Sequence, residues 1–269
     1  MPEAIVKDQR IYYESHGQGD PLVLIRGLGS NADHWYAQLP DLSAHFRVIV
    51  FDNRGIGRSS DPGGDFSIRD MADDTVGLMD ALHIEQAHVL GVSMGGMIAQ
   101  CIAVEHPRRV KGLVLVVSHC GGPQQVQPSA QIAQLIGDMV TVGSPESRIK
   151  ALPAFFDAHT LSSQPACVQT YAAVSLKYPA DVKILSRQFK AIQAFDLSER
   201  LSAIQSPTLV LASQGDVLIP PGNSEILAAG ISGARLVVLP GGGHQILIEQ
   251  PQACNRAIVD FLKCQDVSP

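Results

Sequence analysis

Short runs of apolar residues recur along the chain, and each is bounded by glycine, proline, aspartate or serine. They lie at residues 22–25, 48–51, 89–90, 113–117, 209–211 and 236–239. Because these runs are continuously apolar, they are typical of strands that a parallel sheet buries on both faces. Apolar residues at helical spacing follow several of them, at 68–82, after Ser93 and near 258–262. This order predicts an α/β fold with a mostly parallel central sheet and helices on both faces.

The alternation stops between residues 121 and 195. This stretch has no convincing strand, and its helix-like pieces are separated by prolines, at 132–140, 149–156, 168–176 and 182–192. Six basic and four acidic residues give it a net charge of +2, which leaves −8 on the rest of the chain. We interpret this charge as a solvated surface, although it would favour an anionic substrate if it faced a site. The pattern predicts a core of residues 1–120 and 196–269 with a helical cap at 121–195.

Composition and charge limit the class of protein. With 269 residues, 45% of them hydrophobic, the chain can bury a large core as one domain with an insertion. A net charge of −6 offers no basic surface to nucleic acid or an anionic membrane. The N-terminus lacks a signal-peptide pattern and no apolar run could span a bilayer, so we expect a cytoplasmic protein. Cysteines and histidines lack metal-ligand spacing, so we expect no metal and no cofactor.

The sharpest local signal is Gly91-Val92-Ser93-Met94-Gly95, which lies between a predicted strand and a predicted helix. This is the G-x-S-x-G pattern of a nucleophile elbow in the strand-turn-helix context that it requires. A serine in such a sharp turn needs small neighbours, because a side chain at Gly91 or Gly95 would collide with adjacent backbone. The turn would present the Ser93 hydroxyl at a helix N-terminus, where backbone N–H groups favour developing negative charge.

A serine hydroxyl is a weak nucleophile that needs a base, and the base needs an orienting acid. Asp216 directly follows the predicted strand at 209–211, and His244 follows the strand at 236–239 after three glycines. Both therefore lie at carboxyl ends of strands, where sites form in open α/β sheets. The chain order Ser93, Asp216, His244 is the one expected of a hydrolase triad on such a sheet.

On these residues the chain resembles the α/β-hydrolase fold superfamily, in its branch of serine esterases, enol-lactonases and cofactor-free haloperoxidases. The segment 52–59, DNRGIGRS, is similar to the D-x-R-G-x-G-x-S loop of that family. The resemblance implies that Ser93 attacks a carbonyl, that His244 is general base and then acid, and that Asp216 orients the imidazole. It also implies an oxyanion hole formed by the backbone N–H groups of Leu28 and Met94.

One position departs from the family pattern, because Arg26-Gly27 stands where His-Gly is usual. Our hypothesis is that Arg26 either braces this loop or offers a cation to a carboxylate-bearing substrate. His119, which follows the strand at 113–117, and Trp35, the only tryptophan, are further candidates for substrate contact. Trp35 and five apolar cap residues are candidates for an acyl pocket or for filling the core beneath the cap; the cap residues are Met139, Phe155, Phe156, Phe189 and Phe195.

A competing hypothesis is a dinucleotide site. The strand at 22–25 is followed by a G-x-G-x-x-A pattern from Gly27 to Ala32, and Asp52 ends the next strand about where a ribose-binding acid belongs. This hypothesis leaves Ser93, Asp216 and His244 without a role, whereas the hydrolase hypothesis already accounts for Asp52.

The sequence therefore predicts a carboxylic ester hydrolase of esterase or enol-lactonase type that acts on a small-molecule ester or lactone through an acyl-enzyme. Three further activities on the same scaffold stay open: a C–C bond hydrolase, a cofactor-free perhydrolase or haloperoxidase, and a weakly hydrolytic ligand sensor. The sequence gives neither the substrate's identity nor the oligomeric state.

Overall fold

Eight strands form one sheet in the computed structural model, which describes residues 2–264. Their order across the sheet is β1-β2-β4-β3-β5-β6-β7-β8. The strands are β1 (Glu3–Val6), β2 (Gln9–His16), β3 (Pro21–Ile25), β4 (Arg47–Phe51), β5 (Ala87–Val92), β6 (Val110–Val116), β7 (Thr208–Ser213) and β8 (Arg235–Leu239). From β4 to β8 every neighbouring pair is parallel. The predicted α/β-hydrolase fold, with its mostly parallel sheet, is confirmed.

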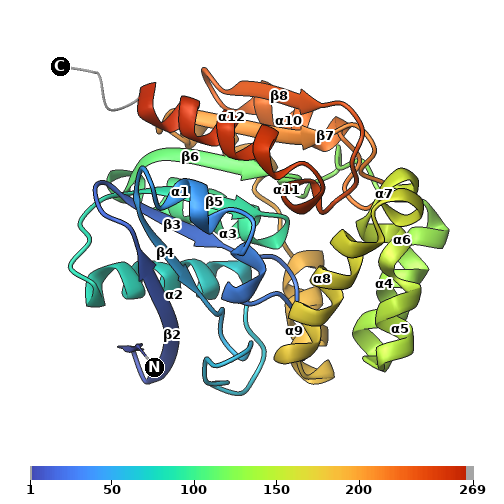
Figure 1. Cartoon of the computed structure of the whole chain (residues 1–269). Coiled ribbons are helices and arrows are strands. Elements are labelled where there is room, and N and C mark those ends of the chain that lie inside the picture. The colour runs from blue at the N-terminus through green and yellow to red at the C-terminus, as the bar shows by residue number, and fades with distance from the viewer. Residues whose placement is uncertain (1, 265–269) are drawn as a thin grey trace.

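Helices cover both faces of this sheet (Figure 1). One face packs against α1 (Leu39–Leu42), α11 (Ile246–Glu249) and α12 (Pro251–Cys264). The other packs against α2 (Ile68–Ala81), α3 (Met94–Glu105) and α10 (Gly222–Gly230). Central strand residues such as Val23 and Leu24 are fully buried on opposite faces. Three short 3-10 helices complete this part: η1 (Ala32–Trp35), η2 (Pro107–Arg109) and η3 (Ser198–Ala203).

The first two strands lie outside the sequence prediction. They form an antiparallel hairpin in which Val6 pairs with Gln9, and β2 then pairs antiparallel with β4. In β1, exposed and buried residues alternate, and Ile5 is 68% exposed. An edge hairpin faces water on one side, so it lacks the continuous apolar run by which the central strands are recognised.

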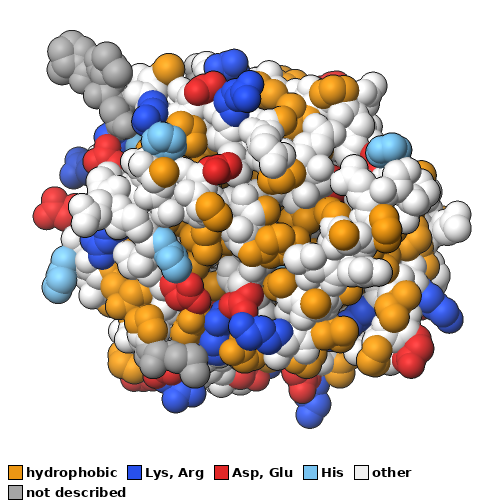
Figure 2. All heavy atoms as spheres, in the orientation of Figure 1, with side chains coloured by type: hydrophobic (Ala, Val, Ile, Leu, Met, Phe, Trp, Pro, Cys, Tyr) orange, Lys and Arg blue, Asp and Glu red, His pale blue; other side chains and the backbone are white. Residues whose placement is uncertain are grey.

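Between β6 and η3 the chain forms six α-helices, which lie beside the sheet in Figure 1. They are α4 (Ala130–Val142), α5 (Pro145–Lys150), α6 (Leu152–Phe155), α7 (Ala158–Ser163), α8 (Pro165–Lys177) and α9 (Val182–Gln193). Their own apolar cluster includes Ile136, Ala154 and Ile184. Large apolar side chains are also exposed here, among them Val142 and Ile149, and Figure 2 shows hydrophobic side chains on this side of the molecule.

Local signals explain where these helices begin and end. Ser129 accepts a hydrogen bond from the N–H of Ile132 at the start of α4, and Gly143 ends that helix with a φ of 65°. Ser144 then caps α5, whose first residue is Pro145. Capping oxygens satisfy the free N–H groups of a first turn, and glycine tolerates the left-handed conformation that stops a helix. No helix within residues 2–264 is both long enough and apolar enough to cross a bilayer.

Candidate active site

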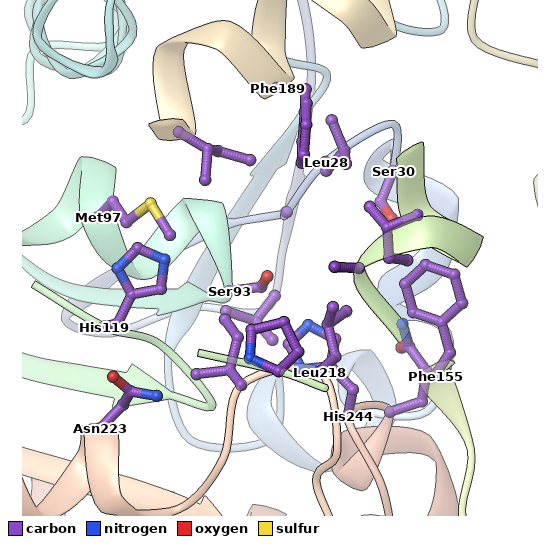
Figure 3. Close-up of a pocket in the computed structure, with 18 of the residues that line it drawn as sticks. Leu28, Ser30, Ser93, Met97, His119, Phe155, Phe189, Leu218, Asn223 and His244 are labelled. Atoms are coloured by element: carbon purple, nitrogen blue, oxygen red, sulfur yellow. The ribbon is translucent and has the colours of Figure 1, made fainter. Parts of the chain in front are cut away.

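Five of the predicted site residues, Arg26 among them, line one cavity at the carboxyl ends of the strands. The cavity has a volume of about 450 Å³, and Ser93, His244, Leu28 and His119 contribute to its wall. In Figure 3, Ser93 lies between the loop that carries Leu28 and the loop that carries His244, with His119 and Met97 on one flank. Residues that follow β3, β5, β6 and β8 are therefore brought to one place by the parallel sheet.

Ser93 occupies a strained turn between β5 and α3. Its φ of 58° and ψ of −122° lie in a region that L-residues rarely adopt. A Cβ at Gly91 would collide with the carbonyl oxygen of Gly95, and a Cβ at Gly95 would collide with that of Ile25. These contacts are with backbone, which cannot turn aside as a flexible side chain can. Glycine is therefore required on both sides of the serine.

Asp216 and His244 form a buried pair. The Nδ1 atom of His244 lies 2.8 Å from Oδ2 of Asp216, and the two residues are 4% and 3% exposed. The other carboxylate oxygen, Oδ1, accepts hydrogen bonds from the N–H groups of Leu218 and Ile219, both at 2.9 Å. With Nδ1–H donating to the carboxylate, the lone pair on Nε2 of His244 is free to accept a proton.

The loop that leads into His244 is held by hydrogen bonds from three directions. Asp157, at the N-terminus of α7, accepts from the N–H of Gly242 at 2.8 Å, and Glu249 accepts from Gly243 at 2.8 Å. Ser213, at the end of β7, donates to the carbonyls of Gly241 and Gly242. These contacts hold the backbone next to His244 and so fix the position of its side chain.

The loop after β3 lies directly against the serine. A Cβ at Gly27 would be 3.0 Å from Cβ of Ser93. Asn53 donates to the carbonyl of Arg26 at 3.1 Å, and Gln188 of α9 accepts from the N–H of Gly29 at 2.9 Å. The loop is thus braced without the Arg26 side chain. Leu28 lines the cavity, whereas the Met94 side chain is fully buried, and only its backbone N–H is relevant to an oxyanion hole.

Arg26 lines the cavity, but Trp35 is not among the residues that do so. Trp35 is fully buried in the core, and the Arg26 guanidinium lies over its ring at 4.7 Å. Burial lowers the pKa of Arg26 to about 10. Trp35 therefore packs beneath Arg26 and does not line the cavity. As part of η1, its side chain belongs to the apolar cluster between the sheet and the helices α1, α11 and α12.

His119 presents a defined hydrogen-bonding face. Its Nδ1 accepts a hydrogen bond from the N–H of Gly121 at 3.0 Å. Burial, with a smaller effect from His244, lowers the pKa of His119 to about 4, so the ring is neutral at pH 7. A neutral imidazole whose Nδ1 is an acceptor carries its proton on Nε2. His119 is thus a neutral N–H donor in the cavity wall.

Several lining residues were not singled out from the sequence. Tyr171 comes from α8, and Gln245 and Leu218 follow the two triad candidates closely in the chain. The adjacency of Gln245 to His244 was a usable signal, but the position of Tyr171 depends on how α8 packs. Of the apolar residues considered between 121 and 195, Phe155 and Phe189 line this cavity.

Basic side chains of the helical segment face acidic side chains of the sheet part. The pairs are Lys177–Asp33 at 2.7 Å, Arg187–Asp61 at 2.5 Å and Lys190–Asp65 at 3.8 Å. None of these three cations lines the cavity. The positive charge of residues 121–195 is therefore partly used in contacts with the rest of the chain, and these cations do not supply charge to the site.

The dinucleotide hypothesis fails at Asp52. This side chain is fully buried, and its carboxylate accepts from the N–H of Ala32 and from the guanidinium and backbone of Arg58. No oxygen of this carboxylate is left for a ribose hydroxyl. Within residues 2–264, no three His, Cys, Asp or Glu side chains are grouped so that they could hold a metal ion.

Comparison with known proteins agrees with this geometry. Residues 20–251 match the family model of the alpha/beta hydrolase fold, so the chain belongs to the α/β hydrolase family and is a hydrolase. It is 31% identical to a protein of Azorhizobium caulinodans named "Putative carbamate hydrolase RutD", over 97% of this chain and 98% of that protein.

Two solved structures are also similar over nearly their whole length. The enol-lactonase from Burkholderia xenovorans has a TM-score of 0.88 and 30% identity, covering 97% of this chain and 100% of that one. A hydrolase from Pseudomonas aeruginosa has a TM-score of 0.85 and 32% identity, covering 97% of each chain.

Proposed function

We propose that the protein is a serine hydrolase that cleaves a small carboxylic ester or lactone through an acyl-enzyme. The observation that carries this proposal is the buried 2.8 Å contact between Asp216 and His244, because His244 lines the same cavity as Ser93. Nucleophile, base and orienting acid are the three groups that such chemistry needs. The 30% identity to an enol-lactonase supports the same reaction class.

In this mechanism Nε2 of His244 takes the proton of the Ser93 hydroxyl while Oγ attacks the substrate carbonyl carbon. The oxyanion that forms would accept hydrogen bonds from the N–H groups of Leu28 and Met94. As the tetrahedral intermediate collapses, His244 returns the proton to the leaving alkoxide, and the acyl group stays on Ser93. Water, deprotonated by His244, then releases the acid and restores the serine.

Residues 121–195 would act as a cap over this site. Phe155, Tyr171 and Phe189, which lie in this segment, contribute to the cavity wall. A cover of this kind excludes water and so strengthens the hydrogen bonds to a developing oxyanion. In this division the core residues 1–120 and 196–269 carry the chemistry, and the cap shapes the acyl or leaving-group pocket.

The test is turnover of p-nitrophenyl acetate and butyrate by the wild type, Ser93→Ala and the control Ser162→Ala. Ser162 is an exposed serine of α7 that donates to backbone carbonyls of its own helix. We expect a burst of p-nitrophenol, a loss of at least about 10⁴-fold in kcat for Ser93→Ala, and a normal rate for Ser162→Ala. Turnover that persists in Ser93→Ala contradicts the assignment.

Hydrolysis of a carbamate is a second candidate, because the name of the relative from Azorhizobium caulinodans refers to it. The cavity size argues for a larger substrate. Its volume of about 450 Å³ lies in the range of roughly 300–1,000 Å³ that small-molecule sites occupy, whereas carbamate itself has four heavy atoms. A higher kcat/KM for phenyl carbamate than for phenyl acetate would favour the carbamate.

A C–C bond hydrolase, a perhydrolase and a ligand sensor would use the same three residues, and turnover measurements separate them from an esterase. The C–C bond hydrolase would cleave a dienol or diketone faster than any ester, and the perhydrolase would need peroxide for its best rate. The sensor would bind esters or lactones without turnover. Ester hydrolysis at an ordinary rate of about 1–10³ per second excludes the sensor.

A further inference from the structure

Arg26 is a buried cation next to the proposed nucleophile. It follows β3 directly, its residue is 2% exposed, and it lines the cavity that Ser93 and His244 share. Its Nε and Nη1 atoms are buried, and neither has a hydrogen-bonding partner among the described residues. Its aromatic contact with Trp35 supplies a π-face but no acceptor oxygen.

Among residues 2–264, no acid balances the charge of Arg26. The groups that act on Arg26 electrostatically are Tyr171 and Tyr36, and burial raises the pKa of both, to about 12 for Tyr36. The nearby His34 is also uncharged, because burial first and Arg26 second lower its pKa to about 3. Arg26 itself, with a pKa of about 10, keeps its proton at neutral pH.

Arg54, the other buried arginine among the described residues, has the acceptors that Arg26 lacks. Arg54, which is 7% exposed, donates to the Asp74 carboxylate at 2.6 Å and to the carbonyl of Asp70 at 3.0 Å. Arginines buried to this degree are ordinarily paired, because an isolated charge loses its hydration without compensation. Arg26 therefore carries a cost that an anion in the cavity would remove.

Two neutral polar residues line the same cavity as Arg26. Tyr171 and Gln245 both line the cavity, and the Gln245 amide lies 3.5 Å from the Tyr171 hydroxyl. Burial raises the pKa of Tyr171 and so keeps the proton on its hydroxyl. A guanidinium with N–H and O–H groups around it matches a carboxylate, which accepts two parallel hydrogen bonds from an arginine.

We propose that Arg26, with Tyr171 and Gln245, forms a subsite for a carboxylate of the substrate, so that the enzyme selects esters or lactones that carry an anionic group. This inference rests on the proposed hydrolase function and adds the substrate class to it. The rival role for Arg26 is general: because its backbone leads into the loop beside Ser93, its charge would stabilise the oxyanion of every substrate alike.

Two esters of similar length separate these roles: p-nitrophenyl hemiglutarate, which bears a carboxylate, and p-nitrophenyl valerate, which does not. Both would be assayed with the wild type, Arg26→Gln, Arg26→Lys and the control Arg187→Gln. Arg187 is a cap arginine paired with Asp61 outside the cavity, so its loss changes the net charge equally. Urea unfolding of each variant shows that it is folded.

For Arg26→Gln we expect kcat/KM to fall about 10- to 100-fold on the hemiglutarate and less than threefold on the valerate, from the strength of hydrogen bonds to charged groups. Arg26→Lys should be intermediate, since lysine keeps the charge but not the paired donors. Arg187→Gln should leave the ratio of the kcat/KM values for the two esters unchanged. If kcat/KM of Arg26→Gln falls by the same factor on both esters, or falls on neither, the proposal is overturned.

Binding of glutarate itself gives a readout that needs no turnover. Millimolar glutarate should raise the urea midpoint of the wild type and of Ser93→Ala, but not that of Arg26→Gln. In the absence of glutarate, Arg26→Gln should unfold at higher urea than the wild type, because it removes an unpaired buried charge. If neither ester is hydrolysed, the hydrolase proposal fails, but the glutarate-induced change in the urea midpoint still tests the anion subsite. If glutarate does not raise the midpoint of the wild type, the subsite proposal is refuted.

Discussion

Replacing Asp216 by asparagine should abolish most activity while leaving the fold in place. The reason lies in which atom faces which neighbour. Oδ1 of Asp216 accepts from two backbone N–H groups, and Oδ2 faces Nδ1 of His244 at 2.8 Å. An asparagine has one acceptor oxygen and one NH₂ group. The oxygen must stay with the two backbone donors, so the NH₂ group faces His244.

The magnitude follows from the cost of the opposite orientation. Turning the amide would break the hydrogen bonds from the N–H groups of Leu218 and Ile219, each worth about 1 kcal/mol. These two buried N–H groups would then face the NH₂ group of the asparagine, which is also a donor. A preference of about 2 kcal/mol already corresponds to roughly 30-fold. His244 would therefore accept at Nδ1 and carry its proton on Nε2, where it cannot take the proton of Ser93. Together with the lost carboxylate charge, we expect kcat to fall about 10⁴-fold, or roughly 5.4 kcal/mol.

The assay is p-nitrophenyl butyrate hydrolysis by the wild type, Asp216→Asn and the control Asp196→Asn. Asp196 is a carboxylate away from the cavity that accepts from Ser198. The urea midpoint of Asp216→Asn should stay close to that of the wild type, since the backbone contacts survive. A kcat within tenfold of the wild type would falsify the reasoning and show that another acid orients His244.

Two further predictions concern stability, each measured by urea unfolding. Gly91→Ala should cost at least about 1–3 kcal/mol, because its Cβ meets the backbone of Gly95, whereas Gly137→Ala, with open space in α4, should stabilise by roughly 0.5–1 kcal/mol; similar midpoints for the two would contradict this. Burial lowers the folded-state pKa of His34 to about 3 and that of His119 to about 4, below the ordinary value of 6.5. Between these values and pH 6.5 the unfolded chain therefore binds more protons than the folded chain. The free energy of unfolding should fall as the pH is lowered from 6.5 towards 4. The slope should reach at most about 2.7 kcal/mol per pH unit and should be about half as steep in His34→Gln; a flat profile would refute it.

The central part of the fold could be predicted because its physical signal is local. Buried parallel strands such as β6 need continuous apolar runs, and the turn at Ser93 needs glycines at fixed positions. Asp216 and His244 were recognisable because both closely follow such strands. The edge hairpin of β1 and β2 was missed because exposed and buried residues alternate in β1 and because β2 mixes buried with polar, partly exposed positions, so neither strand has a continuous apolar run.

The wall of the site formed by helices could not be predicted, because it depends on contacts between distant segments. Tyr171 reaches the cavity only because α8 packs against η1, where Lys177 meets Asp33 and Ser175 meets His34. Trp35 was a candidate both for the pocket and for the core, and it lies in the core beneath Arg26. Nothing in the local sequence distinguishes a tryptophan that lines a cavity from one that packs beneath a residue of the cavity wall.

Two separate costs to stability meet at one edge of the sheet. Ser93 has a φ of 58°, and Arg26 is buried with two unpartnered nitrogens; Gly27 brings their loops into contact. Backbone strain alone does not mark a site, since Lys7 and His83 also have positive φ and do not line the cavity. The strained backbone of Ser93 and the unpaired charge of Arg26 together are better evidence for a functional site than strain alone. A substitution at either residue could remove its own cost to stability without affecting the other. A chain retains both where function depends on them, which favours a site where nucleophile and anion recognition work together.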